Sequence, residues 1–244
     1  MILIKIIMPL RYKIIWMTLF AVAMGFLESA VVIYMRELLY PDGFAFPLSL
    51  IPGHLVLTEL LREVATILML LSIAVIAGQT FLERFAWFIY IFGVWDIFYY
   101  IFLKVMINWP ASLLTWDLLF LIPTTWTGPV VAPVIVSILM IIMAICIIKR
   151  NKENPHYKIS RLSWILTICG SIIIFTAFIY DYSSFILNNF SFIELLSLPS
   201  QTLYDLSLKY IPLNFPWVLL VAGSTLIIIA IIKIIKHEPT PKNL

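Results

Sequence analysis

Acidic and basic side chains stand at helical spacing within long apolar runs of this sequence. One set repeats at i, i+3, i+4 and i+7, the spacing of a single helix face: Glu59, Arg62, Glu63 and Thr66. An ionised group inside a bilayer costs a few kcal/mol, so such a face is expected to meet other protein groups rather than lipid. Carboxyl and guanidinium groups gathered in this way can transfer protons or hold a charged ligand.

Two other apolar stretches carry comparable polar faces. The later one repeats at i+3 or i+4 and consists of Gly93, Asp96, Tyr100 and Lys104. The earlier one carries Glu28 and Arg36, eight residues apart. At a rise of about 1.5 Å per residue, Glu28 and Asp96 fall at a depth similar to that of the first set, in the outer half of the membrane. We therefore expect three neighbouring helices to turn their polar faces toward one another.

The candidate site follows from these faces. The predicted catalytic residues are Glu63, Asp96, Glu59 and Glu28, with Glu63 or Asp96 as acid or base. The predicted substrate-binding residues are Arg62, Arg36, Lys104, Tyr100, Asp117 and Trp95. Among these, Arg62 and Lys104 are expected to hold an anionic group. Asp117 is consistent either with an acid that faces the cavity or with one at the water interface, and Trp126 is typical of an anchor among the lipid headgroups.

Two alternatives compete with this interpretation. In a purely structural one, Arg62 pairs with Glu28 or Glu59, and Asp96 bonds a tyrosine or tryptophan, so the polar groups only fix the register of the helices. In the other, a metal binds the weak candidate set His54, Glu59 and Glu63. The chain has no HExxH motif, so no metal site is predicted and no cofactor is identified.

Composition defines the class of protein. Hydrophobic residues make up 63% of the chain and charged residues 12%, and the mean hydropathy is +1.06. These values indicate an all-α polytopic integral membrane protein and exclude a soluble one. The net charge of +3 does not suggest nucleic-acid binding, and two cysteines within apolar runs imply no disulfide framework. With no polar linker, residues 1–244 are predicted to form one helical bundle.

The apolar runs predict six membrane spans, at about 14–35, 55–77, 85–106, 130–148, 162–180 and 217–235. The apolar segment 111–122 lies between Pro110 and Pro123 and is too short to cross a membrane, so a re-entrant or interfacial helix is expected there. Residues 182–216 alternate apolar and polar side chains. We expect this segment to lie on the outer membrane surface as amphipathic pieces that cover the cavity.

The basic residues predict the orientation in the cell membrane. Six spans with both termini in the cytoplasm place twelve of the sixteen basic residues on the cytoplasmic side: Lys5, Arg11, Lys13, Arg84, Lys149, Arg150, Lys152, Lys158, Arg161, Lys233, Lys236 and Lys242. The acids are concentrated in the outer half instead. Because acids contribute little to topology, a polar cavity there is the expected cause.

Three functions are compatible with this pattern. The first is a membrane-embedded enzyme or binding protein for a lipid-soluble substrate with a polar head, which implies the bilayer and a lipid or isoprenoid-like molecule as partners. The second is a proton- or cation-coupled carrier of small solutes. It is disfavoured because no charged residue lies between Gly93 and Arg84, where an inner gate is needed. The third is a non-catalytic assembly subunit; the sequence predicts no oligomeric state.

Overall fold

The computed structural model describes residues 8–41, 43–154, 157–195 and 200–236. Six of its helices are long and apolar enough to cross a membrane: α1 (Leu10–Leu39), α2 (Gly53–Ala77), α3 (Phe81–Ile107), α4 (Val131–Glu153), α5 (Arg161–Asn189) and α8 (Trp217–Lys236). The other described elements are the short helices α6 (Phe192–Leu195) and α7 (Ser200–Ser207) and the strands β1 (Trp116–Phe120) and β2 (Trp126–Pro129). The predicted class, an all-α polytopic membrane protein with six spans, is confirmed.

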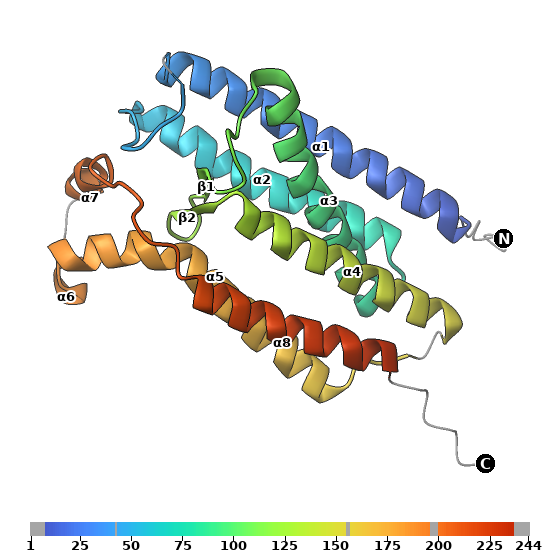
Figure 1. Cartoon of the computed structure of the whole chain (residues 1–244). Helices are drawn as coiled ribbons and strands as arrows, with labels where there is room; N and C mark the ends of the chain where they lie inside the picture. Colours follow the sequence, from blue (N-terminus) through green and yellow to red (C-terminus); the bar gives the residue numbers. More distant parts are fainter. Residues whose placement is uncertain (1–7, 42, 155–156, 196–199, 237–244) are drawn as a thin grey trace, which may run out of the picture.

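The start of α1 and the end of α8 lie at the same end of the bundle, which we call the terminal end (Figure 1). The opposite end, which we call the hairpin end, holds β1, β2 and α7. Helices carry Lys13, Arg84, Arg150 and Lys233 near the terminal end. This distribution is the reason for expecting the terminal end in the cytoplasm, which stays a prediction. Lys5 and Lys242, which the charge argument also used, are outside the described residues.

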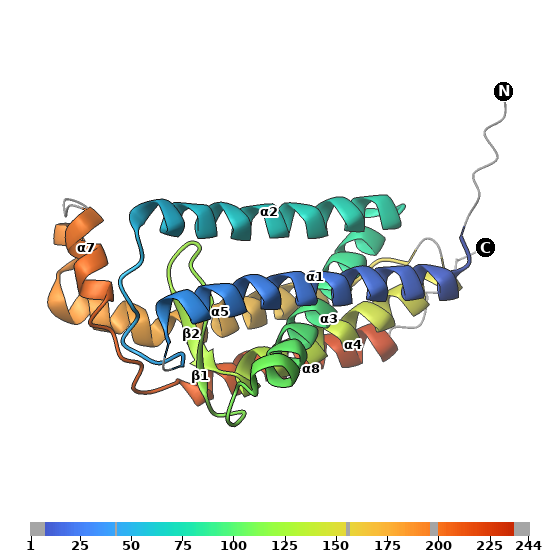
Figure 2. The same cartoon turned by 90° about the horizontal axis from the view of Figure 1, so that it is seen from above.

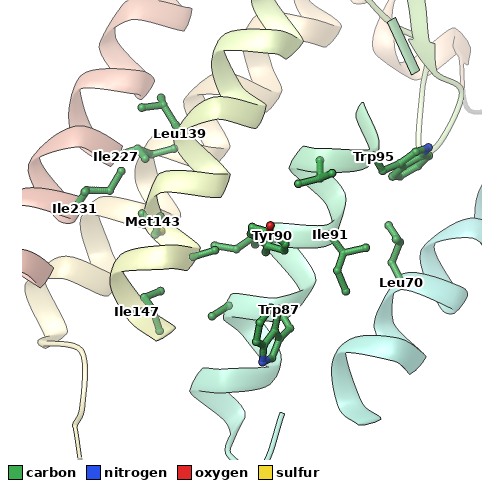
Figure 3. Packing of buried hydrophobic residues seen from close by; sticks show 14 of the residues in the cluster. Leu70, Trp87, Tyr90, Ile91, Trp95, Leu139, Met143, Ile147, Ile227 and Ile231 are labelled. Carbon is green, nitrogen blue, oxygen red and sulfur yellow. The ribbon is translucent and has the colours of Figure 1, made fainter. Parts of the chain in front are cut away.

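Helix α3 is central to the fold. It packs against α1, α2 and α4, whereas α8 packs against α5 and α4. Figure 3 shows Leu70 of α2 facing Ile91 of α3. The hydroxyl of Tyr90 on α3 lies 2.7 Å from that of Thr18 on α1. Leu70 and Ile91 are fully buried. The aromatic and branched side chains of α3 thus form the apolar core that holds the other helices in place.

Glycines set the closest helix contacts. A Cβ atom on Gly93 would lie 2.7 Å from the carbonyl oxygen of Ser137, so α4 reaches α3 only because this side chain is missing. Helices α5 and α8 cross at Gly170 and Gly223, where a Cβ on Gly223 would lie 2.7 Å from the carbonyl oxygen of Gly170. Small residues that allow close backbone approach are the usual contact between membrane helices.

The prediction of a re-entrant or interfacial helix over 111–122 is wrong. Strand β1 instead pairs with β2 in an antiparallel hairpin, with Asp117 opposite Gly128 and Leu118 opposite Thr127. A short apolar segment between two prolines can form few hydrogen bonds within itself, whereas pairing with a second strand satisfies its backbone groups. The tryptophan, leucine and phenylalanine side chains of β1 also suit a strand.

The expected surface segment 182–216 also needs correction. Helix α5 continues to Asn189, well beyond the predicted end at 180. The polar Asp181 that suggested the end of the span is satisfied by the returning chain: its carboxylate accepts hydrogen bonds from the hydroxyl of Tyr210 and from the backbone N–H groups of Leu213 and Asn214. Only α6 and α7 are separate short helices in the described part of this segment.

Candidate functional site

A cavity of about 390 Å³ opens among α1, α2, α3, α4 and the hairpin. All the predicted catalytic and substrate-binding residues except Lys104 line it: Glu28, Arg36, Glu59, Arg62, Glu63, Trp95, Asp96, Tyr100 and Asp117. In Figure 2, α2 runs as a separate layer and the hairpin rises toward it. Tyr204, Ser207 and Leu208 at α7 also line the cavity, as expected for part of the segment 182–216.

Arg62 joins α1 and α2 through a three-residue charge cluster. Its Nη2 lies 3.0 Å from Glu28 Oε1 and 2.5 Å from Glu59 Oε1, and its Nε donates to Glu59 Oε2 at 2.9 Å. Both pairs of the purely structural interpretation are therefore present at once. A single guanidinium is shared by two carboxylates, so the cluster keeps a surplus negative charge when all three groups are ionised.

Glu63 has a different partner. Its two carboxylate oxygens accept from the backbone N–H of Leu121, at 3.0 and 3.1 Å, just beyond the end of β1. A backbone donor at this depth needs an acceptor because no water is available in the hydrocarbon. Glu63 thus holds the hairpin against α2. In the described part of the chain, no basic side chain forms an ion pair with it.

Asp96 accepts a hydrogen bond from the hydroxyl of Ser137, at 2.7 Å. The partner is a serine of α4, not the tyrosine or tryptophan of the structural interpretation. The contact depends on the close approach of the two helices at Gly93. Asp96 is half-buried and forms no ion pair among the described residues. It is therefore a second carboxyl group of the cavity without a basic partner.

Arg36 and Asp117 form a buried pair at the hairpin side of the cavity. Arg36 Nη2 lies 3.0 Å from Asp117 Oδ1, and the hydroxyl of Tyr100 donates to Asp117 Oδ2 at 3.2 Å. The guanidinium is held between two rings, 3.8 Å from the centroid of Trp109 and 4.4 Å from that of Phe44. Asp117 lies outside the six spanning helices, where burial raises its pKa to about 6 and Arg36 opposes the rise. Of the two placements left open, Asp117 has the one facing the cavity.

Two predicted residues lie elsewhere. Lys104 is exposed, and its Nζ donates to the carbonyl oxygens of Asn108 and Pro110, so it caps the end of α3. It does not join Arg62. His54 is exposed at the start of α2. Within the described ranges, no three His, Cys, Asp or Glu side chains are arranged to hold a metal, so the set His54, Glu59 and Glu63 is not assembled.

Aliphatic side chains supply most of the remaining wall and aromatic ones much of the rest, and sequence reasoning assigned one of the aromatic residues elsewhere. Trp126, expected among the headgroups, lines the cavity from β2 and packs against Phe120 of β1, with ring centroids 5.6 Å apart. Trp95 and Phe92 lie side by side on α3, with centroids 5.0 Å apart. Ser137 was also missed, and no motif marks it. The hairpin that brings in Trp126 joins two strands separated by only five residues, but the apolar run between the two prolines was interpreted as a helix.

The cavity has a closed floor toward the terminal end. Between Asp96 and Arg84, α3 carries no charged side chain. The core at this level is made of apolar and aromatic residues, among them Trp87, Ile91 and Ile147 (Figure 3). The polar groups are thus concentrated at the hairpin end.

Comparison with protein-family models, with curated proteins and with solved structures gives no match for this chain. The class of polytopic membrane protein therefore rests on the six apolar helices, and the site rests on its geometry.

Proposed function

We propose that the protein binds a lipid-soluble molecule with a polar head in this cavity, as a membrane-embedded binding protein or enzyme. The observation that carries the proposal is a largely apolar cavity whose wall includes two carboxyl groups, Glu63 and Asp96, that form no ion pair with any basic residue in the described part of the chain. Its volume lies within the range of about 300–1,000 Å³ common for small-molecule sites. Ionisable groups within spans usually mark a path or site for a ligand.

The arrangement of α2 supports access from the bilayer. This helix packs mainly against α3 and forms an outer layer of the bundle (Figure 2), and residues such as Glu59 and Glu63 on it line the cavity. Its polar ties to the rest of the bundle include the Arg62 cluster, the hydrogen bond between Glu63 and the hairpin, and the bond from Lys13 Nζ to the carbonyl oxygen of Ala77. Its opposite face is apolar, with Leu57, Leu61 and Leu68 exposed. A lipid-soluble molecule can thus approach along α2 without leaving an apolar environment.

An enzymatic role assigns acid–base chemistry to Asp96 or Glu63. Glu28 and Glu59 are engaged by Arg62, which leaves them less able to exchange a proton. Asp96 has a single donor, Ser137, and faces the cavity. It is the carboxyl group best placed to reach a bound molecule, and Glu63 comes second because its oxygens serve the hairpin.

The carrier remains a second candidate because the same two carboxyl groups suit a coupled proton or cation. The closed apolar floor weighs against it, since alternating access needs a path toward the terminal end. An assembly subunit needs no molecule in the cavity, whereas a binding protein does. The presence of a copurifying molecule therefore distinguishes the two functions.

The test is native mass spectrometry of gently extracted protein, with lipid and metal analysis. Wild type is compared with Glu63→Gln and Asp96→Asn, and with the control Glu37→Gln, which changes an exposed acid outside the cavity. We expect a stoichiometric organic molecule on wild type and on the control, and its loss from both cavity variants. Wild-type protein that is empty in every preparation, and as stable as the variants, would favour the assembly role.

A further inference from the structure

We infer that the head of the molecule bound in this cavity carries a positive charge, as in a lipophilic amine or quaternary ammonium compound. The inference rests on the proposed function and names its ligand class. It arises from two observations: the balance of acids and bases in the wall, and the aromatic side chains around the acids that form no ion pair among the described residues.

The charge balance excludes a strong anion site. The cavity wall holds five acids, Glu28, Glu59, Glu63, Asp96 and Asp117, and its basic residues are Arg36 and Arg62. Both guanidinium groups form ion pairs, with Asp117 in one case and with two glutamates in the other, while Nη1 of Arg36 has no hydrogen-bond partner among the described residues. Lys104, the other residue expected to hold an anionic group, is outside the cavity. An anionic head would therefore meet a surplus of negative charge in a medium of low dielectric constant.

The aromatic wall favours an organic cation. The cavity is lined by Trp95, Tyr99 and Tyr100 close to Asp96 along α3, and by Phe120 and Trp126 from the hairpin. Ring faces attract cations, and ammonium groups are commonly bound by aromatic residues together with a carboxylate. A metal ion needs several converging oxygen or nitrogen ligands. No such group of three exists among the described residues, whereas an ammonium head needs only one or two carboxylates.

Trp95 is part of this aromatic wall. Its side chain lines the cavity and is 2% exposed. Its indole N–H lies within reach of the Glu28 carboxylate, so the ring and this acid border the same part of the cavity.

The test uses three radiolabelled probes with the same twelve-carbon chain: dodecyltrimethylammonium, dodecanol and dodecanoate. Binding is measured by equilibrium dialysis of the full chain in nanodiscs of phosphatidylcholine, below the micellar concentration, with empty nanodiscs subtracted. The variants are Asp96→Asn, which keeps an oxygen for the Ser137 hydroxyl, and Glu63→Gln, with Glu37→Gln as the control. Gel filtration verifies that each variant is folded.

We expect saturable binding of dodecyltrimethylammonium that is at least about tenfold tighter than that of dodecanol, with dodecanoate weakest. The cation preference should fall in both cavity variants and stay unchanged in Glu37→Gln. If dodecanol or dodecanoate binds saturably and at least as tightly as the cation, the inference is overturned and the proposed function stands. If none of the three binds saturably to folded wild type, the proposed function fails as well.

Discussion

The contact between α5 and α8 and the contact between α2 and its neighbours are built from different interactions. At the first, two glycines let the backbones touch, and the surrounding residues are apolar, such as Ile174 and Ile227. At the second, α2 is joined to α1 and the hairpin by carboxylates and a guanidinium. Both contacts hold spanning helices together, but only the second places charge inside the membrane.

This difference separates scaffold from site. Close packing of small residues is enough to associate helices in lipid, where the hydrophobic effect gives no preference between helix and lipid contacts. Charged contacts at α2 are therefore not needed for assembly as such, and buried ion pairs seldom add net stability. The polar contact is best explained by the cavity it surrounds. The following substitutions test each side of the comparison.

The largest loss of stability is expected at the glycine crossing. Gly223→Val adds a branched side chain where a Cβ alone would lie 2.7 Å from a carbonyl oxygen, so the helices must separate, at a cost of at least about 3 kcal/mol. Thermal unfolding in detergent, followed by gel filtration, measures the loss. Gly53→Ala is the control because its Cβ would enter open space. A Gly223→Val protein as stable as wild type would refute the role given to this crossing.

Arg62→Gln should have the next largest effect. It leaves Glu28 and Glu59 side by side without their shared cation, at a cost of about 2–3 kcal/mol. This is below the value for a fully buried pair because the side chains are 15–22% exposed. Adding Glu28→Gln and Glu59→Gln to the same protein should recover most of the stability in the same unfolding assay. If the stability does not recover, Arg62 does not stabilise the protein by neutralising the charges of Glu28 and Glu59.

Two changes at Glu63 separate its hydrogen bond from its charge. Glu63→Leu leaves the N–H of Leu121 without an acceptor and should cost about 1–2 kcal/mol in the free energy of unfolding. Glu63→Gln keeps an acceptor oxygen and should cost less than about 0.5 kcal/mol while still weakening ligand binding. Equal losses of stability for the two variants would argue against the hydrogen bond to the hairpin.

The smallest effect is expected at Lys104. Lys104→Ala removes donors from the end of α3 and should cost about 0.5 kcal/mol, with ligand binding unchanged. Asp96→Asn on the same helix should show the opposite pattern, a small change in stability and a clear loss of binding. Thermal unfolding and probe binding are measured on both proteins. A binding defect in Lys104→Ala would show that Lys104 belongs to the site after all.

The sequence predicted the helical class and the charged residues of the cavity wall because both depend on local patterns. Glu59, Arg62 and Glu63 share one face in any helix, and the cost of charge in lipid requires that face to meet protein. Lys104 followed the same periodicity, but it lies at the last turn of α3, where backbone carbonyls offer a closer partner. Helical spacing gives the face of the helix on which a side chain lies, but it does not say where that helix ends.

The hairpin could not be predicted in this way. Its strands are close in the chain, but the N–H of Leu121 just beyond β1 is satisfied by the carboxylate of Glu63, which comes from a helix far earlier in the sequence. Ser137 was missed for a similar reason, because a serine within an apolar run carries no signal until Gly93 brings α4 against Asp96. Both features come from contacts between segments, which neither composition nor periodicity contains.

The central claim is that the cavity, rather than the outer surface, holds a lipid-soluble molecule. Photolabelling of the full chain in nanodiscs with a diazirine-bearing twelve-carbon ammonium probe tests it most directly, with labelled residues identified by mass spectrometry. The account predicts saturable labels on cavity residues such as Trp126 and Met140, removed by an excess of unlabelled dodecyltrimethylammonium. Labels confined to outward residues such as Leu61 and Val105, and not reduced by competition, would contradict it.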